Sequence, residues 1–169
     1  GSKYYAAHPA IPLEKTVAVI NLDALSVIGP TKELVVIGLG NSTLDDIARG
    51  LAERQQRVLV EESEPQNGSF FRSDHFNFAK AGVPALYAKG GVDHREKGRD
   101  YGLAWSRDYV ANRYHKVGDN LDPGWDLRGV VEDLNLLYGV GRQLGSSREW
   151  PNYVEGNPFR KTPARGAAR

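Results

Sequence analysis

The 169-residue sequence contains no cysteine and no methionine. Without cysteine the chain has neither disulfide bonds nor thiolate chemistry, and the redox compartment stays open. No apolar run approaches the roughly 20 residues that cross a membrane, so we expect no membrane partner. A formal net charge of +1 gives no reason to expect binding to nucleic acid.

Several catalytic signatures are also missing. The sequence has no His-Glu-x-x-His, no phosphate-binding loop, no Gly-x-Ser-x-Gly and no dinucleotide fingerprint. These absences argue against a gluzincin-type protease, a nucleotide-binding enzyme and a serine hydrolase.

The composition that is present is ordinary for one globular domain. Hydrophobic residues make up 40% and charged residues 25% of the chain, and the length allows a sizeable core. Positive charge concentrates in residues 147–169, which carry five basic and two acidic side chains. We interpret this segment, which contains proline, as a tail that either wraps around the domain or frays.

Apolar runs and helical spacing alternate along the chain. Runs without polar interruption predict buried strands, and apolar residues at one-face spacing predict helices. We expect strands at residues 16–22, 33–38, 57–61 and 84–88, and helices at 44–52, 74–82 and 127–144. Residues 89–105 are expected to form a long loop that is functional or mobile.

This alternation predicts an α/β fold, with a mixed, mostly parallel sheet in a three-layer α/β/α arrangement formed by residues 1–146. Only four strands are visible, and several look central rather than edge-like. Since a parallel sheet needs both faces and both edges covered, we expect this sheet to be part of a larger one.

Acidic side chains stand where predicted elements meet loops. Asp23 ends the first apolar run, which suits either a carboxylate ligand or a capped loop start. Ser73 or Asp74 can cap the helix that follows, and a role in a site is the alternative for Asp74. His75 follows it without an evident partner, which favours a structural role.

A second imidazole candidate is His115, which is followed four residues later by Asp119. A carboxylate beside a ligand imidazole commonly fixes its tautomer, and a surface hydrogen bond between the two is the alternative. Asp93 and His94 lie among charged residues of the long loop, and we expect both to be solvated. Asp and His side chains are oxygen and nitrogen ligands that zinc accepts.

Three segments together resemble the zinc-dependent aminopeptidase family that includes bacterial leucyl aminopeptidases. They are residues 21–23 (Asn-Leu-Asp), residues 71–84 (Phe-Arg-Ser-Asp-His-Phe through Ala-Gly-Val-Pro) and residues 114–119 (Tyr-His to Asp). The resemblance covers roughly residues 3 to 145. Glutamate carboxypeptidase and glutaminyl cyclase are more distant relatives, and the transferrin receptor has the same fold without catalysis.

The resemblance implies a site with two zinc ions that acts on peptides. In this pattern Asp23 is similar to the ligand of one ion, and His115 to a ligand of the other, with Asp119 supporting it. Asp74 is similar to a carboxylate that organises the substrate end of the pocket, and Phe71 and Arg72 correspond to its lining.

The family's first histidine, its bridging aspartate and its pair of glutamates, one of them the general base, have no counterpart in this sequence. The chain therefore resembles the C-terminal half of such an enzyme, and we assign no catalytic residue. A catalytic zinc normally needs three protein ligands. We expect weak zinc binding, no peptidase activity of the isolated chain, and self-association or pairing with an N-terminal half.

Three other interpretations stay open. An aminoacyl transferase of the glutaminyl cyclase type shares the fold, a non-catalytic peptidase-like module would bind without turnover, and a generic α/β domain would use its Asp and His residues as caps and surface pairs. The presence of both Asp23 and His115 favours an enzyme ancestor. The resemblance also makes a secreted or periplasmic origin an expectation.

Overall fold

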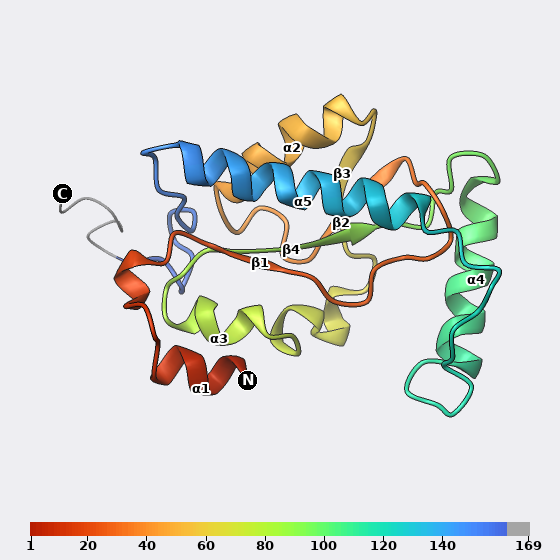
Figure 1. Cartoon of the computed structure of the whole chain (residues 1–169), viewed down its shortest axis with the longest axis horizontal. Helices are drawn as coiled ribbons and strands as arrows, with labels where there is room; N and C mark the ends of the chain where they lie inside the picture. Colours follow the sequence, from red (N-terminus) through yellow and green to blue (C-terminus); the bar gives the residue numbers. More distant parts are fainter. Residues whose placement is uncertain (162–169) are drawn as a thin grey trace.

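The computed structural model describes residues 1–161 of the chain. Four strands form one sheet in the order β1-β4-β2-β3 (Figure 1). They are β1 (Val19–Asn21), β2 (Glu33–Val36), β3 (Val58–Glu61) and β4 (Ala85–Gly90). β1 is parallel to β4 and β2 to β3, whereas β2 and β4 are antiparallel. The predicted mixed, mostly parallel sheet is confirmed.

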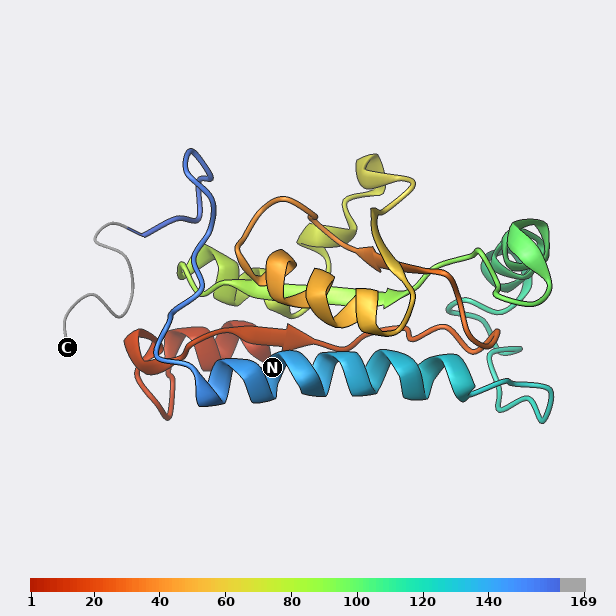
Figure 2. The same ribbon diagram turned by 90° about the horizontal axis from the view of Figure 1, so that it is seen from above.

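Helices cover both faces of the sheet, as predicted (Figure 2). α2 (Leu44–Arg54) and α5 (Arg128–Ser146) pack on one face, α3 (His75–Lys80) packs on the other, and α1 (Ser2–Ala7) contacts α3. The larger core lies between the sheet, α2 and α5, and includes Leu34, Val36, Leu44, Ala48, Leu86, Ala88, Leu136, Leu137 and Val140. A smaller, aromatic core on the α3 side includes Ile37, Phe70, Ala79, Tyr87 and Tyr153.

Short helical turns complete the connections. Three 3-10 helices span Leu13–Lys15, Pro65–Asn67 and Ser69–Phe71. Just before α2, the amide of Leu44 donates a hydrogen bond to Ser42 Oγ over 3.3 Å. No helix within residues 1–161 has the length and apolar character needed to cross a membrane.

The prediction of a long loop at residues 89–105 is partly wrong. β4 continues to Gly90, and α4 (Gly98–Asn112) begins inside the predicted loop. Gly102 is the one buried residue of α4, so this helix lacks the apolar stripe by which amphipathic helices are recognised. α4 stands at one end of the molecule, away from the sheet (Figure 1).

The first apolar run is also not buried on both faces. β1 lies at an edge of the sheet, its residues Val19 and Ile20 are half-buried, and Leu22 just beyond it is exposed. β3 forms the opposite edge. The sequence of an edge strand that packs against an apolar helix is as rich in apolar residues as the sequence of a central strand. The hydropathy pattern therefore does not distinguish the two.

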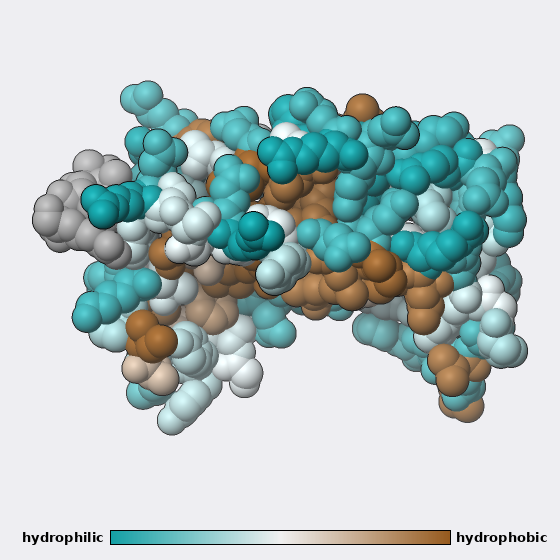
Figure 3. All heavy atoms as spheres, turned by 45° about the horizontal axis from the view of Figure 1, so that its top comes forward, coloured by the Kyte–Doolittle hydropathy of each residue, from teal (hydrophilic) through white to brown (hydrophobic). Residues whose placement is uncertain are grey.

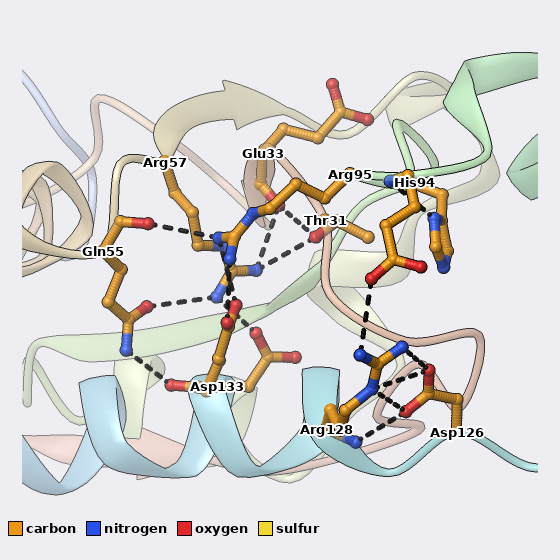
Figure 4. A network of polar contacts seen from close by, with 11 residues as sticks. Thr31, Glu33, Gln55, Arg57, His94, Arg95, Asp126, Arg128 and Asp133 are labelled. Atoms are coloured by element: carbon orange, nitrogen blue, oxygen red, sulfur yellow. Dashed lines mark hydrogen bonds and ion pairs between the residues drawn. The ribbon is translucent and has the colours of Figure 1, made fainter.

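A buried ion pair joins the sheet to α5. Arg57 Nη1 lies 2.7 Å from Asp133 Oδ1, and both side chains are 1% exposed. Arg57 also donates hydrogen bonds to the carbonyl of Glu33 and the hydroxyl of Thr31 (Figure 4). Asp133 accepts one from the amide of Gly90. Burial raises the pKa of Asp133, and Arg57 opposes this effect.

The basic tail wraps back over the domain as far as it is described. Tyr153 is buried, and its hydroxyl donates a hydrogen bond to the carbonyl of Val83 over 3.0 Å. The Phe159 ring stacks on Phe70 with centroids 5.9 Å apart. The rest of the predicted tail, residues 162–169, lies outside the described residues.

Candidate functional site

The candidate site lies where β1 ends, beside β4 and the turn before α3. Tyr87 and Lys89 are alternate residues of β4, so their side chains point to the same face of the sheet. The register pairs Asn21 with Tyr87, and Asp23 follows two residues after Asn21. The turn before α3 brings Ser73 to the same place.

Ser73 links the side chains of Asn21 and Asp23. Asn21 Nδ2 donates a hydrogen bond to Ser73 Oγ over 2.8 Å, and Ser73 Oγ donates one to Asp23 Oδ2 over 2.8 Å. This chain of hydrogen bonds orients the Asp23 carboxylate. Within residues 1–161 the second oxygen, Oδ1, makes no hydrogen bond, so it is open to a cation or a donor.

Asp74 occupies the N-cap position of α3, but its side chain does not cap the helix, so the capping interpretation is wrong. Its Oδ1 accepts a hydrogen bond from Ser2 Oγ over 2.7 Å, and Asn77 Nδ2 donates to the same hydroxyl over 2.8 Å. The carboxylate is thus held between α1 and α3. Phe71 and Arg72, which precede it, are exposed, and the role of these three side chains in binding substrate stays a prediction.

Electrostatic interactions connect the three segments that carry the candidate residues. Burial, together with smaller effects of Asp23 and Tyr114, raises the pKa of Tyr87 to about 12. Burial lowers the pKa of Lys89, and Asp23 and Glu62 oppose this.

His75 is fully buried beneath this site. Its ring centroid lies 4.8 Å from that of Phe70, edge to face, and 5.2 Å from that of Tyr87. Burial lowers the pKa of His75, and the charges of Asp23 and Asp74 oppose this. A neutral imidazole packed among aromatic rings agrees with the structural role that we expected.

His115 is exposed in the segment that follows α4. Its ring stacks on Tyr114 with centroids 3.9 Å apart, and its φ of 57° lies in the left-handed region. Ala24, directly after Asp23, also has a positive φ, of 50°. A third non-glycine residue with positive φ within residues 1–161, Gln56 at 58°, lies in the turn between α2 and β3, away from the candidate residues.

Stacked rings tie this segment to α4. Trp105 and Tyr109 stack at 5.2 Å with an interplanar angle of 7°, and the Tyr109 ring contacts that of Tyr114 at 5.9 Å. The Arg113 guanidinium lies 5.2 Å from the Trp105 centroid. Asp119 accepts a hydrogen bond from the Tyr109 hydroxyl over 3.1 Å, and its support of the neighbouring histidine stays a prediction. The position of α4 therefore sets where the candidate histidine ligand lies.

Residues 1–161 alone do not form a metal centre. No group of three or more His, Asp or Glu side chains among them could hold a metal ion. Asp23 and His115 are two single candidates, whereas a catalytic zinc normally has three protein ligands. No reaction step through a metal follows from these residues by themselves.

His94 is not solvated as predicted. The ring is buried, and its Nδ1 accepts hydrogen bonds from the backbone amides of Glu96 and Lys97 over 3.0 and 2.9 Å. His94 thus pairs with two amides of the turn that leads into α4. Its neighbour Asp93 forms an ion pair with Lys32 over 3.2 Å.

Sequence reasoning did not single out Tyr87 or Lys89, and it considered Ser73 only as a possible cap of the following helix. The period of two in β4 was a usable signal for Tyr87 and Lys89, because it sets both on one face of the strand. No local signal existed for Ser73, since its partner Asp23 is 50 residues away in the chain.

Comparison with known proteins adds a family match. The model of Peptidase family M28 matches residues 1–138, a span that contains Asp23, the segment 71–75 and His115. Neither the curated proteins nor the solved structures gave a significant match.

Proposed function

The chain belongs to Peptidase family M28, and on this premise we propose that it is part of a zinc-dependent aminopeptidase that removes N-terminal residues from peptides. Peptidases of this family are generally zinc-dependent. The observation that supports the proposal best is the hydrogen-bonded arrangement of Asn21, Ser73 and Asp23, which orients a carboxylate at the end of a strand.

In this proposal Asp23 is a ligand of one zinc ion and His115 a ligand of the other. Asp119 supports His115, and Asp74, Phe71 and Arg72 line the substrate end of the pocket. The remaining ligands and the general base come from residues that this sequence does not contain. Since each ion then receives one ligand from this chain, the 169 residues by themselves neither bind zinc tightly nor hydrolyse peptides.

A non-catalytic, peptidase-like binding module is the second candidate. The observation that favours it is that residues 1–161 contain no group of three side chains able to hold a metal ion. It differs from the first candidate in that zinc and turnover would be lacking even when the rest of the domain is present.

The test measures zinc content after dialysis against a slight excess of zinc, together with hydrolysis of a leucine anilide. We expect the isolated chain to hold almost no zinc and to show no turnover. In the polypeptide that also carries the remaining ligands, Asp23→Asn and His115→Gln should each lower turnover by about 100-fold or more.

Asp93→Asn and His8→Gln are the matched controls, because both side chains lie outside the candidate site. They should leave zinc content and turnover unchanged. Tight zinc binding with hydrolysis by the isolated chain would overturn the proposed division of ligands. A polypeptide complete in ligands but without zinc and turnover would instead establish the binding module.

A further inference from the structure

A pocket lies between three segments that are distant in the chain. Side chains of residues 38–41 after β2, residues 62–71 after β3 and residues 157–159 of the tail line it, and it encloses about 340 Å³. Pockets that bind small ligands enclose roughly 300–1,000 Å³. Figure 2 shows the tail and the segment after β3 on the side of the molecule opposite α5. The volume is therefore sufficient to hold a small group or one side chain of a peptide.

This pocket is remote from the sheet edge that β1 forms. A band of apolar surface runs beside that edge, where Ile20, Leu22 and Leu134 line a common groove (Figure 3). The proposed function assigns the rest of the sheet to residues that this sequence does not contain, so the exposure of that band identifies no partner. The pocket instead follows β2 and β3, and β3 is the opposite edge.

Close contacts fix the walls of the pocket. Gly38 has a φ of 78°, and a Cβ there would lie 2.5 Å from Asn41 Nδ2 and 2.8 Å from Phe70 Cδ2. Asn157 Nδ2 donates a hydrogen bond to Asn41 Oδ1 over 3.0 Å, which ties the tail to the turn after β2. The walls thus hold one another in place across long separations in the chain.

Three phenylalanine rings supply the apolar part of the lining. The buried ring of Phe70 contacts Phe71 edge to face, with centroids 5.6 Å apart, and stacks on Phe159. Phe71 is 60% exposed, so its ring is accessible to a ligand. The faces of aromatic rings are electronegative and attract cations.

Glu62 supplies a carboxylate to the lining. Among residues 1–161 this carboxylate accepts no hydrogen bond and forms no ion pair, although Lys89 interacts with its charge. Residues 61–71 contain three glutamates and no basic side chain. The pocket therefore combines a negative charge with aromatic rings, which are the surroundings that an organic cation favours.

The basic side chains at the end of the tail are directed elsewhere. Arg160 donates a hydrogen bond to the carbonyl of Tyr153, and the side chain of Lys161 packs on Gly82. None of the residues within 1–161 that line the pocket carries a positive charge. The negative charge of the pocket is therefore open to a cation from outside the chain.

We propose that this pocket binds the basic side chain of a peptide, with arginine favoured over lysine. A planar guanidinium can stack on Phe71 and donate two hydrogen bonds to Glu62, whereas an ammonium is a compact point charge. Phe71 precedes Ser73, which orients Asp23, by two positions, so the pocket adjoins the candidate site. Binding needs no metal ion, whereas its role in selecting basic peptides for hydrolysis rests on the proposed function.

The binding of arginine amide and of citrulline amide to the 169-residue chain, followed by NMR of the backbone amides, tests the pocket without zinc. Citrulline amide is the matched ligand, because its side chain has nearly the shape of arginine but no charge. We expect arginine amide to shift the signals of residues 38–41, 62–71 and 157–159. It should also bind at least about tenfold more tightly than citrulline amide.

Glu62→Gln should weaken the binding of arginine amide by about tenfold, and Phe71→Leu by about two- to fivefold. Glu61→Gln is the matched control, because it removes the same charge from an exposed neighbour that does not line the pocket. The same spectra verify that each variant is folded. Equal affinity of the unchanged chain for both ligands would overturn the proposal, as would equal losses in Glu61→Gln and Glu62→Gln.

Turnover is measured in the polypeptide that also carries the remaining ligands, with peptides that have arginine or citrulline in the first two positions. We expect kcat/KM to be about tenfold higher for the arginine peptides, and Glu62→Gln to abolish this ratio. Equal rates would overturn the role of the pocket in selecting substrates. If neither kind of peptide is hydrolysed, the proposed peptidase function fails, whereas the binding of arginine amide still decides on the pocket.

Discussion

At the scale of single residues, two buried histidines have opposite surroundings. His94 has two backbone amides that donate to its Nδ1. His75 has no hydrogen-bond partner for either ring nitrogen within residues 1–161. A charged imidazole at His75 would lose its hydration without forming an ion pair, and this lowers its pKa.

His75 should therefore make stability depend on pH. The unfolded chain binds a proton to this residue near pH 6.5, and the folded chain does so only at lower pH. Between the two pKa values the unfolded state holds more protons. The contribution of His75 to the free energy of unfolding is therefore fully present above about pH 6.5 and is lost as the pH drops toward the folded pKa. We expect His75→Leu to remove this slope in urea unfolding measured between about pH 5 and 8.

The matched control is His8→Leu, because His8 is exposed and should leave the slope as it is. Comparison of slopes rather than of absolute stabilities separates titration from packing, since both variants also change apolar contacts. An unchanged slope in His75→Leu would contradict the assignment of the pH dependence to this residue.

At the scale of elements, α4 is attached by backbone contact rather than by an apolar core. Gly102 is its one buried residue, and a Cβ there would lie 1.9 Å from the carbonyl oxygen of Val92. The candidate ligand His115 follows α4 and is tied to it by stacked rings. The placement of that ligand thus depends on a close approach that only glycine allows.

Gly102→Ala should push α4 away from the segment that carries Val92. We expect a loss of about 1–3 kcal/mol, typical of an overpacked site, and faster hydrogen exchange of α4 amides with little change in β4. Gly50→Ala in α2 is the matched control, because a Cβ there meets no atom within 4 Å. It should stabilise the chain by up to about 1 kcal/mol through helix propensity. Equal exchange of α4 in both variants would show that Gly102 does not anchor this helix.

At the scale of the whole molecule, one buried ion pair connects the sheet to the helix that covers it. Arg57 immediately precedes β3, and Asp133 lies in the second turn of α5 (Figure 4). Arg57 donates to the Glu33 carbonyl of β2, and Asp133 accepts from the Gly90 amide of β4. Both charges are out of water, so each depends on the other for compensation. The pair links strands that lie side by side to the helix that covers them.

Asp133→Ala should lower the free energy of unfolding by about 3–5 kcal/mol, because it leaves the Arg57 charge buried and unpaired. Replacing both residues, in Arg57→Met with Asp133→Leu, should restore most of that loss, since two apolar side chains need no compensation. Urea unfolding of the single and double variants measures this coupling.

The surface pair of Lys32 and Asp93 supplies the control. Lys32 is 53% exposed, so Asp93→Ala should cost less than about 1 kcal/mol. A double variant as unstable as Asp133→Ala would mean that the loss comes from a cavity rather than from an uncompensated charge.

Much of the architecture was predictable from the chain alone. All four strands and the helices α2, α3 and α5 follow from apolar runs and from one-face spacing, which act over a few residues. The candidate residues Asp23, Asp74 and His115 were visible because each adjoins such an element or a recognisable segment. α4 was missed because its buried contact is made by a glycine, which carries no hydropathy signal.

The sequence by itself determined the type and order of most elements and the identity of the candidate ligands. Only the tertiary structure decided that β1 is an edge, that His94 is buried, and that Ser73 orients Asp23. The physical reason is the sequence separation over which each signal acts. Periodicity is a property of neighbouring residues, whereas burial and hydrogen bonding depend on partners far away in the chain. Ser73 and Asp23 are 50 positions apart in the chain, and only folding brings their side chains together.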